Sequence, residues 1–344
     1  MTTPFPVLAE MSLPSPVRRL ESFGNGNELW LKDDSHIHPI YGGNKCRKLA
    51  RLLRKAAQKG ARQVVTFGAA GSHHVLATSL LAQASGFSVR AFVVPQPWTA
   101  HAEQVLRASV ASGAELLTLK SWVEVLQVGT QLWSSGTLLI PPGGSNISGS
   151  LGYFDAALEL AVQIERGELP EPDTIVVPFG TTGTAAGLLA GLEYSGLKSK
   201  VVGVSVLRAP ARAGLARAIA DAILRELNER GRARRNELVI DSRWVGRGYG
   251  FETDEGRGAA ERAQSLDLPL DPSYTAKAFA AAWALGEGRN HDSYGGRPIA
   301  MPNVPQRILY WHTLSAPCSL QSESDGANPV PVKFQQLLRP CPAS

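Results

Sequence analysis

Short apolar runs alternate with longer amphipathic segments along most of this chain. Six runs rich in β-branched and aliphatic residues predict strands, at residues 63–67, 88–95, 114–119, 136–140, 174–178 and 200–206. Helical periodicity predicts helices between them, at residues 74–84, 99–111, 152–166 and 185–194. Strand, glycine loop and helix recur in this order. The alternation predicts an α/β fold with mostly parallel strands and helices on both faces of the sheet.

The glycine loops are the expected place for ligands. In open α/β sheets, ligands bind at the carboxyl ends of the strands, where these loops lie. The linker at residues 167–172 separates an earlier set of strands from a later one, and 344 residues suffice for two domains.

Composition narrows the class of protein. Apolar residues make up 44% and charged residues 19% of the chain, which is typical of a globular protein with a sizeable core. We find no run long enough to span a bilayer and no secretory signal, so we expect no membrane partner. Three cysteines favour a reducing cytoplasm over a disulfide framework, and no Cys or His spacing resembles a zinc site.

An arginine-rich stretch at residues 208–247 carries much of the net charge of +5. Such a run is compatible with nucleic-acid binding or with a solvated helix and loop surface. The arginines alternate with Ala, Leu, Ile and Glu at helical spacing, and no aromatic platform accompanies them. The solvated surface is therefore the expectation, and no nucleic-acid partner is predicted.

Residues 41–49 contain a lysine, Lys45, just behind Gly42, Gly43 and Asn44, where a helix begins. Glycine lets the backbone approach a ligand closely and adopt a positive φ. A lysine at such a junction can form a Schiff base with an aldehyde cofactor. A glycine turn before a basic helix face is the alternative interpretation.

Residues 180–187, Gly-Thr-Thr-Gly-Thr-Ala-Ala-Gly, follow a strand and open a helix. Small residues let backbone N–H groups converge on an anion, and the helix N-terminus adds a positive partial charge. The segment matches neither a Walker A loop nor a dinucleotide fingerprint. It predicts a phosphate site, with a tight packing turn as the alternative.

Ser72 stands at another junction of strand and helix, followed by His73 and His74. Its hydroxyl and nearby N–H groups suit a carboxylate, while an N-capping serine is the alternative. Two later turns place Tyr249 and Tyr274 beside glycine or proline, where either tyrosine lines a site or packs in the core.

Taken together and in this order, these segments resemble one family. They are similar to the pyridoxal-phosphate (PLP) enzymes comprising 1-aminocyclopropane-1-carboxylate deaminase and D-cysteine desulfhydrase. The matching segments are residues 31–34, 42–49, 142–146, 149–153, 180–187, 248–250, 271–275 and 312–313. The resemblance covers about residues 10 to 320. It implies the tryptophan-synthase-β-like fold, with two open twisted, mostly parallel sheets flanked by helices.

The resemblance also assigns roles to residues. Lys45 would carry PLP as a Schiff base, and Asn44 and His73 would lie beside the cofactor. Residues Gly180, Thr181, Thr182, Gly183 and Thr184 would hold its phosphate. Ser72 would contact the substrate near its carboxylate, and Thr275 and Thr313 would lie near the pyridine ring. Tyr249 and Tyr274 would line the substrate side, where either one could assist proton transfer.

Two of these positions distinguish the branches of the family. The resembling deaminases have Glu after the tyrosine and Leu after the later His, whereas this chain has Thr275 and Thr313. A neutral hydroxyl stabilises a pyridinium less than a carboxylate does. Expelling a thiolate needs less electron withdrawal than opening a cyclopropane. The pattern therefore implies D-cysteine desulfhydrase-like β-elimination, which yields sulfide, pyruvate and ammonia, with Lys45 as the base.

The chain departs from the family at His73, where Asn is usual, and at Leu314-Ser315, where two glycines are usual. Residues 291–306 are also irregular for a helix-to-strand connection. These departures keep two alternatives open: a deaminase or other amino-acid-processing PLP enzyme, and a PLP- or phosphate-binding protein with weak catalysis.

We expect a large PLP-binding domain at residues 1–49 and 158–325, a small domain at 50–157, and a tail at 326–344. The resemblance implies a homodimer that acts on a small amino acid.

Overall fold

The computed structural model describes residues 6–132, 136–207, 212–228, 236–289, 304–316 and 330–339. Within-chain contacts divide the protein into two compact units. The first unit contains residues 1–12, 36–144 and 315–344, and the second contains residues 13–35 and 145–314. The predicted domains share this discontinuous plan but assign residues 1–12, 36–49, 145–157 and 315–344 differently. That domain division stays a prediction.

The described part of the second unit is built on a six-stranded sheet with the order β1-β2-β11-β8-β9-β10. Its strands are β1 (Val17–Ser22), β2 (Glu28–Asp33), β8 (Thr174–Phe179), β9 (Lys200–Ser205), β10 (Leu238–Asp241) and β11 (Arg307–His312). All neighbours pair in parallel except β1 and β2, which are antiparallel. Every residue of β8 is buried, as expected for a central parallel strand.

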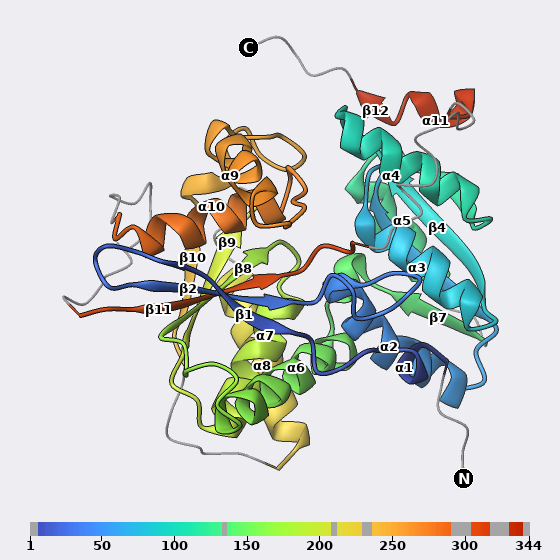
Figure 1. Cartoon of the computed structure of the whole chain (residues 1–344). Coiled ribbons are helices and arrows are strands. Elements are labelled where there is room, and N and C mark those ends of the chain that lie inside the picture. Colours follow the sequence, from blue (N-terminus) through green and yellow to red (C-terminus); the bar gives the residue numbers. More distant parts are fainter. Residues whose placement is uncertain are drawn as a thin grey trace. The chain divides into compact units, whose positions relative to one another are not determined.

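Helices cover both faces of this sheet (Figure 1). On one face lie α6 (Ile147–Glu165), α7 (Gly183–Ser195) and α8 (Arg212–Glu226). On the other lie α9 (Asp254–Gln264) and α10 (Thr275–Gly286), which follow the short 3₁₀ turn η2 (Arg243–Val245). Each face has its own apolar core, so the alternating chain folds as the sequence pattern predicts.

Small residues let α6 and α7 pack closely. A Cβ atom at Gly187 would lie 2.2 Å from the backbone oxygen of Ser150, and one at Gly191 would lie 2.5 Å from the Cβ of Ala157. Backbone and a rigid methyl group cannot move aside at low cost. The two glycines therefore hold α7, and the loop that precedes it, against α6.

The first unit has a parallel sheet with the order β6-β4-β3-β7. Its strands are β3 (Gln63–Ala69), β4 (Ser88–Val94), β6 (Glu115–Thr118) and β7 (Thr137–Ile140), and the turn η1 (Pro142–Gly144) follows β7. Its helices are α1 (Pro6–Ala9), α2 (Gly43–Gln58), α3 (His73–Ala84), α4 (Ala100–Ala111) and α5 (Trp122–Gln131).

A C-terminal piece of the chain packs onto this first unit. Helix α11 (Val332–Gln335) leads to β12 (Leu338–Arg339), which pairs in parallel with β5 (Gln96–Pro97). Val330, Phe334 and Leu337 are buried in a cluster with core residues of β4 and α4. Three apolar side chains thus anchor residues 330–339 of the predicted tail to this unit.

The observed elements agree with most predicted ones to within two residues. Helix α6 is the exception, since it begins at Ile147 rather than at residue 152. The side chain of Asn146 accepts a hydrogen bond from the Gly149 N–H at 2.8 Å and caps the helix there. Strands β1, β2, β10 and β11 were not predicted. Of the irregular stretch at residues 291–306, residues 291–303 lie outside the described residues.

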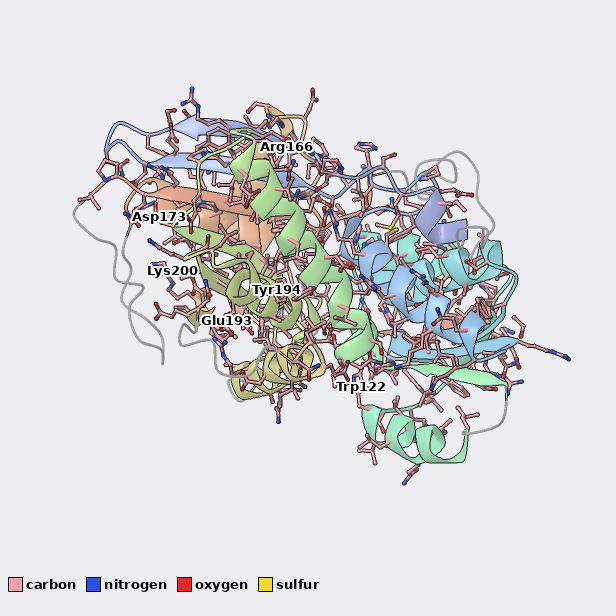
Figure 2. The ribbon with its side chains drawn as sticks, turned by 90° about the horizontal axis from the view of Figure 1, so that it is seen from below. Trp122, Arg166, Asp173, Glu193, Tyr194 and Lys200 are labelled. Carbon is pink, nitrogen blue, oxygen red and sulfur yellow. The ribbon has the colours of Figure 1, made fainter. Side chains whose placement is uncertain are left out.

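The arginine-rich stretch matches the expected solvated surface only in part, since Arg225 and Arg247 are exposed but three other arginines are bound. Arg217 pairs with Glu193 of α7, which Figure 2 labels, and Arg243 pairs with Asp241 at the end of β10. Arg212 donates a hydrogen bond to the Gly180 carbonyl at 2.7 Å. These three side chains bind specific partners in the second unit, whereas Arg208, Arg230, Arg232, Arg234 and Arg235 lie outside the described residues.

None of the helices in the described part of the chain is both long enough and apolar enough to cross a membrane.

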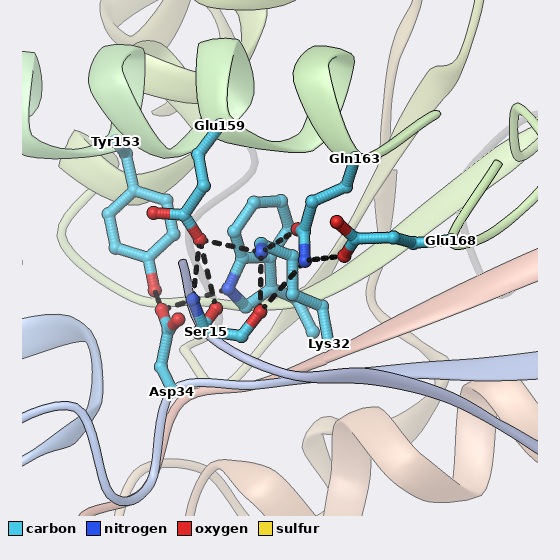
Figure 3. Close-up of polar contacts among 8 residues, drawn as sticks. Ser15, Lys32, Asp34, Tyr153, Glu159, Gln163 and Glu168 are labelled. Atoms are coloured by element: carbon cyan, nitrogen blue, oxygen red, sulfur yellow. Dashed lines mark hydrogen bonds and ion pairs between the residues drawn. The ribbon is translucent and has the colours of Figure 1, made fainter. Parts of the chain in front are cut away.

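A buried polar network connects β2 to α6 in the second unit (Figure 3). Lys32 is fully buried, and its Nζ lies 2.7 Å from Glu159 Oε1, 2.5 Å from Gln163 Oε1 and 3.2 Å from the Ser15 carbonyl. Gln163 in turn donates to Glu168 at 2.8 Å. A buried cation is tolerated only when acceptors surround it, as they do here.

We expect Lys32→Met to lower the free energy of unfolding by about 3–5 kcal/mol, because it leaves the Glu159 carboxylate without its buried cation. The matched control is Arg90→Met, which breaks the exposed pair of Arg90 and Glu115 and should cost less than about 1 kcal/mol. Denaturant titration of both variants measures the difference. Equal losses would show that the network contributes no more than a surface pair.

Candidate functional site

The carboxyl ends of the parallel strands in the first unit gather several polar groups at one edge. The loops after β3 and β7 lead to Ser72 and to Gly143, and both lie at this edge. Lys48 of α2 reaches the same place, since its Nζ lies 3.2 Å from the Gly143 carbonyl. The arrangement is the one expected for ligand sites in α/β sheets.

Lys45 lies in the first turn of α2 and is half-buried. Gly43, two residues before it, has φ of 71°, a conformation that favours glycine. The Lys45 Nζ donates a hydrogen bond to Asn44 Oδ1 at 2.6 Å. The predicted junction of glycines, lysine and helix is therefore present.

Lys48 is a second lysine at this edge, and it is 3% exposed. Burial, with the charge of Lys45 as a smaller cause, lowers the pKa of Lys48 to about 7. Near neutral pH a large share of Lys48 is thus an uncharged amine. Such a group is a nucleophile or a base in its own right.

His74 lies beside both lysines, but its ring is hydrogen-bonded to other parts of the fold. Burial and the charges of Lys45 and Lys48 lower its pKa to about 3, so the ring is neutral. Its Nε2 lies 2.9 Å from the Thr66 hydroxyl, which also bonds the Ile140 carbonyl at 3.1 Å. His74 thus joins α3 to two strands of the sheet.

Ser72 and His73 begin α3. Ser72 is the N-cap, and its Oγ accepts from the Val75 N–H at 3.5 Å, so the alternative interpretation of this serine as a capping residue is supported. His73 has a partner at each ring nitrogen: Tyr41 Oη lies 2.6 Å from Nδ1, and His101 Nε2 lies 2.7 Å from Nε2.

The loop between β8 and α7 in the second unit has the features of an anion site. It opens a 13-residue helix, whose N-terminus carries a partial positive charge. Thr182 has φ of 76°, which is strained for a β-branched residue and costs about 1–3 kcal/mol. Its Oγ1 is buried and has no hydrogen-bond partner among the described residues. Strain and an unsatisfied hydroxyl together indicate a loop shaped for a ligand.

Two residues outside the loop brace it. Ser145 Oγ donates to Thr181 Oγ1 at 2.8 Å and accepts from the Gly183 N–H at 3.2 Å. Arg212 bonds the Gly180 carbonyl from the other side. A Cβ at Gly183 would lie 2.7 Å from Ser145 Oγ, so glycine is needed at this position.

Tyr249 and Tyr274 lie against each other in the second unit. Their rings meet edge to face with centroids 5.7 Å apart, and their hydroxyls are hydrogen-bonded. Withdrawal from water raises the pKa of both hydroxyls. Tyr274 also lies next to residues 180–184, the predicted phosphate loop, since a Cβ at Gly180 would be 3.3 Å from its Cε1.

The loop that carries Tyr249 is held by Lys277 of α10. The fully buried Lys277 Nζ donates to the carbonyls of Val245 and Gly248 at 3.0 and 3.4 Å. Burial lowers the pKa of Lys277 to about 8, against a smaller raising effect of Asp271.

Thr275 is bound to Asp271 through its hydroxyl. Its Oγ1 donates to Asp271 Oδ2 at 2.7 Å and accepts from the Asp271 N–H at 2.7 Å. The hydroxyl proton is therefore bonded to Asp271, so the oxygen can only accept a hydrogen bond from any further partner. Thr313 follows β11 and is 7% exposed.

The structure thus brings the predicted residues together in two groups. Asn44, Lys45, Ser72 and His73 belong to the first unit, and the residues of the phosphate loop, Tyr249, Tyr274, Thr275 and Thr313 belong to the second. The described residues contain no cluster of three or more His, Cys, Asp or Glu side chains suited to a metal. Sequence reasoning assigned no role to four supporting residues, namely Lys48, His101, Ser145 and Asp271.

Comparison with known proteins decides the family. The sequence profile of pyridoxal-phosphate dependent enzymes matches residues 10–297. The chain belongs to this family. Its cofactor is therefore PLP, and the resemblance drawn from its motifs is confirmed at this level.

Solved structures of several PLP-family enzymes share the fold. An ACC deaminase homologue is 25% identical, with 94% of this chain and 99% of that chain covered and a TM-score of 0.75. An L-serine ammonia-lyase from Rhizomucor miehei is 16% identical, with coverage of 90% and 95% and a TM-score of 0.60. O-ureido-L-serine synthase is 15% identical, with coverage of 94% and 96% and a TM-score of 0.62. The last two establish the fold alone, with its two mostly parallel, helix-flanked sheets.

The described residues fit PLP. The cofactor needs a lysine for its aldehyde and a cradle for its phosphate. In the first unit, Lys45 in its glycine-rich helical turn would supply the lysine. In the second unit, the Thr182 hydroxyl at the N-terminus of α7 would supply a donor to the phosphate.

We expect Gly183→Ala to weaken PLP binding about tenfold or more, because the new methyl group displaces Ser145 and the loop that it braces. Gly258→Ala in α9 is the matched control, since a Cβ there meets nothing within 4 Å. Fluorescence titration of cofactor-free protein with PLP compares the two. Unchanged affinity in Gly183→Ala would show that this loop does not hold the cofactor.

We expect Lys48→Met to stabilise the cofactor-free protein relative to wild type more at pH 6 than at pH 10. The pKa of Lys48 is lowered from 10.5 to about 7, so between these values the unfolded wild type binds more protons than the folded state. Wild-type stability therefore rises with pH in this window, by about 1.4 kcal/mol for each pKa unit at most. Denaturant titration at several pH values checks this. Lys55→Met, at an exposed position of the same helix, should show no such trend, and a flat difference for Lys48→Met would contradict its lowered pKa.

Proposed function

We propose that this PLP-dependent enzyme is a carbon–sulfur lyase of the D-cysteine desulfhydrase type. In the balanced reaction, D-cysteine and water give sulfide, pyruvate and ammonia. The bound PLP supplies an electron sink for the pair left when the Cα–H bond breaks. The remaining chemistry falls to side chains of this chain.

Lys45 is the proposed attachment point of the cofactor and the base that takes the Cα proton. Its Nζ becomes available for this task once the substrate amine has replaced it. The contact with Asn44 Oδ1 orients that Nζ within the first turn of α2. Ser72, at the N-terminus of α3, is proposed to bind the substrate carboxylate, because the helix end favours an anion there.

The loop from Gly180 to Thr184 is the proposed phosphate site, with Ser145 and Arg212 holding its shape. Tyr249 and Tyr274 are proposed to move a proton on the substrate side. Their raised pKa values keep both hydroxyls protonated at neutral pH, so either one can donate to the departing thiolate. Lys277 keeps Tyr249 in place by holding the carbonyls of its loop.

The choice of a desulfhydrase reaction over a deaminase reaction rests on one observation, the neutral hydroxyl of Thr275. The group after Tyr274 is a neutral hydroxyl whose proton is held by Asp271. If it lies near the ring of the cofactor, it stabilises positive charge on that ring less than a directly contacting carboxylate would. β-Elimination of a good leaving group needs less electron withdrawal than opening a cyclopropane ring, and this favours the desulfhydrase reaction.

Two alternatives have support of their own. The similarity to an ACC deaminase homologue over 94% of the chain favours a deaminase or another amino-acid-processing enzyme. The engaged ring of His73 favours a PLP-binding protein with weak catalysis, since neither ring nitrogen is left without a protein partner.

We further propose that the enzyme is a cytoplasmic homodimer. The family resemblance supports the dimer, and the sparse set of three cysteines supports a reducing compartment.

Purified holoenzyme assayed with D-cysteine, L-cysteine and 1-aminocyclopropane-1-carboxylate tests the reaction. We expect sulfide and pyruvate from D-cysteine at a kcat/KM at least about tenfold above that for the other two, a difference of about 1.4 kcal/mol in barrier. Lys45→Ala should abolish turnover and the visible absorbance of the bound cofactor. Ketobutyrate and ammonia from the cyclopropane substrate as the main products would make the protein a deaminase. PLP binding without turnover of any of the three would favour the binding protein.

A further inference from the structure

Tyr41, His73 and His101 form a hydrogen-bonded chain in the first unit. Tyr41 Oη lies 2.6 Å from His73 Nδ1, and His73 Nε2 lies 2.7 Å from His101 Nε2. The two imidazole rings are tilted by 36°, with centroids 4.9 Å apart. Tyr41 stands four positions before Lys45, His73 begins α3, and His101 is the second residue of α4.

The short contact between two ring nitrogens limits the protons that it can hold. Two N–H groups pointing at each other would repel, and two bare nitrogens would not bond, so one proton lies between His73 and His101. When both rings are neutral, this proton sets the tautomers: if it belongs to His101, His73 carries its own proton on Nδ1 and donates to Tyr41. If it belongs to His73, Nδ1 accepts from Tyr41. Either way the pair holds at most one positive charge without breaking the bond.

Burial decreases along the hydrogen-bonded chain from Tyr41 to His101. Tyr41 is 1% exposed, His73 is 9% exposed, and His101 is half-buried. Buried polar groups of this kind are costly unless they are paired, so His101 satisfies a nitrogen of His73 that would otherwise lose a partner.

The chain also constrains what His73 can do for a ligand. An imidazole has two ring nitrogens, and both already have a protein partner. A hydrogen bond from His73 to a ligand therefore requires exchange of Tyr41 or His101. Of the two, His101 is the more accessible and the more easily exchanged.

We propose that His101 is a positioning residue of the cofactor site, which acts through His73 by sharing one proton with it and holding its ring against Tyr41. The contact with His73 stands on the geometry alone, whereas its relevance to the cofactor rests on the proposed function. His101 then decides which tautomer His73 presents and whether a nitrogen of His73 is released to a ligand.

The direct test is long-range ¹H–¹⁵N NMR of the histidine rings in cofactor-free protein. Wild type should show one strongly downfield ring proton shared by His73 and His101. His101→Ala should lose this proton and change both nitrogen shifts of His73. His101→Gln, whose amide can still bond Nε2, should restore the wild-type tautomer. His36→Ala, at an exposed histidine of the same unit, is the control and should change neither.

The same variants are then loaded with PLP. His101→Ala should move the absorbance maximum of the cofactor and lower kcat on the order of tenfold with little change in KM, while His101→Gln restores both. Unchanged His73 nitrogen shifts in His101→Ala would overturn the proposal, as would an unchanged cofactor band.

Two further variants distinguish failure of the hydrogen-bonded chain from failure of the proposed function. If His101→Ala does not fold, Tyr41→Phe tests the other end of the chain. It should change the His73 Nδ1 shift and leave the shared proton in place, and an unchanged Nδ1 shift would count against the chain. Failure of the proposed function appears separately, as a cofactor band that survives Lys45→Ala, and it leaves the NMR result intact.

Discussion

Parallel pairing of strands is the constraint on which the rest of the structure depends. In a parallel sheet every strand ends at the same edge, so the loops that follow are gathered there whatever their separation in sequence. In the first unit this brings the loops after β3 and β7 to Lys48. In the second unit it places the loop after β8 and Thr313 after β11 at a common edge, because β8 and β11 are parallel neighbours.

Buried polar groups cost free energy, and the surroundings of Lys32, Lys48 and Thr182 compensate for that cost to different extents. Lys32 is surrounded by acceptors and serves the fold. Lys48 has a single described acceptor, the Gly143 carbonyl, and its pKa falls to about 7. Thr182 combines a strained backbone with an unsatisfied hydroxyl. Unfavourable features of this kind are concentrated at functional sites, and in each unit they lie beside a residue with a proposed role in cofactor binding.

The sequence was sufficient for the parallel core, for the helix that begins at the glycines before Lys45 and for the loop before α7. Strand β8 reads clearly because all six of its residues are buried, and the glycines near Lys45 and in the loop before α7 are needed for local reasons. Strands β1 and β2 were missed because charged residues interrupt their apolar pattern, as Arg18 and Lys32 show. Lys32 looks polar in sequence, yet it is fully buried by partners more than a hundred residues away.

The supporting residues of the site could not be predicted for the same reason. His101 stands in an ordinary amphipathic helix, and only the folded chain brings it to His73. Ser145 lies in a segment that matches the family, but its bonds to Thr181 and Gly183 depend on the packing of α6 against α7. Asp271 differs, because its carboxylate accepts from the backbone N–H groups of Ser273, Tyr274 and Thr275, and such local turns of Asp are recognisable in sequence.

Lys45 and Lys48 are both candidates for the lysine that carries PLP, and one measurement distinguishes them. Lys45 is half-buried in the first helical turn, whereas Lys48 is more deeply buried and its pKa is lowered to about 7. Borohydride reduction of the holoenzyme makes the bond between cofactor and lysine permanent, and peptide mass spectrometry then locates it. We expect the added mass on Lys45. Attachment to Lys48, or to a lysine elsewhere in the chain, would contradict the assignment of Lys45 as the residue that carries PLP.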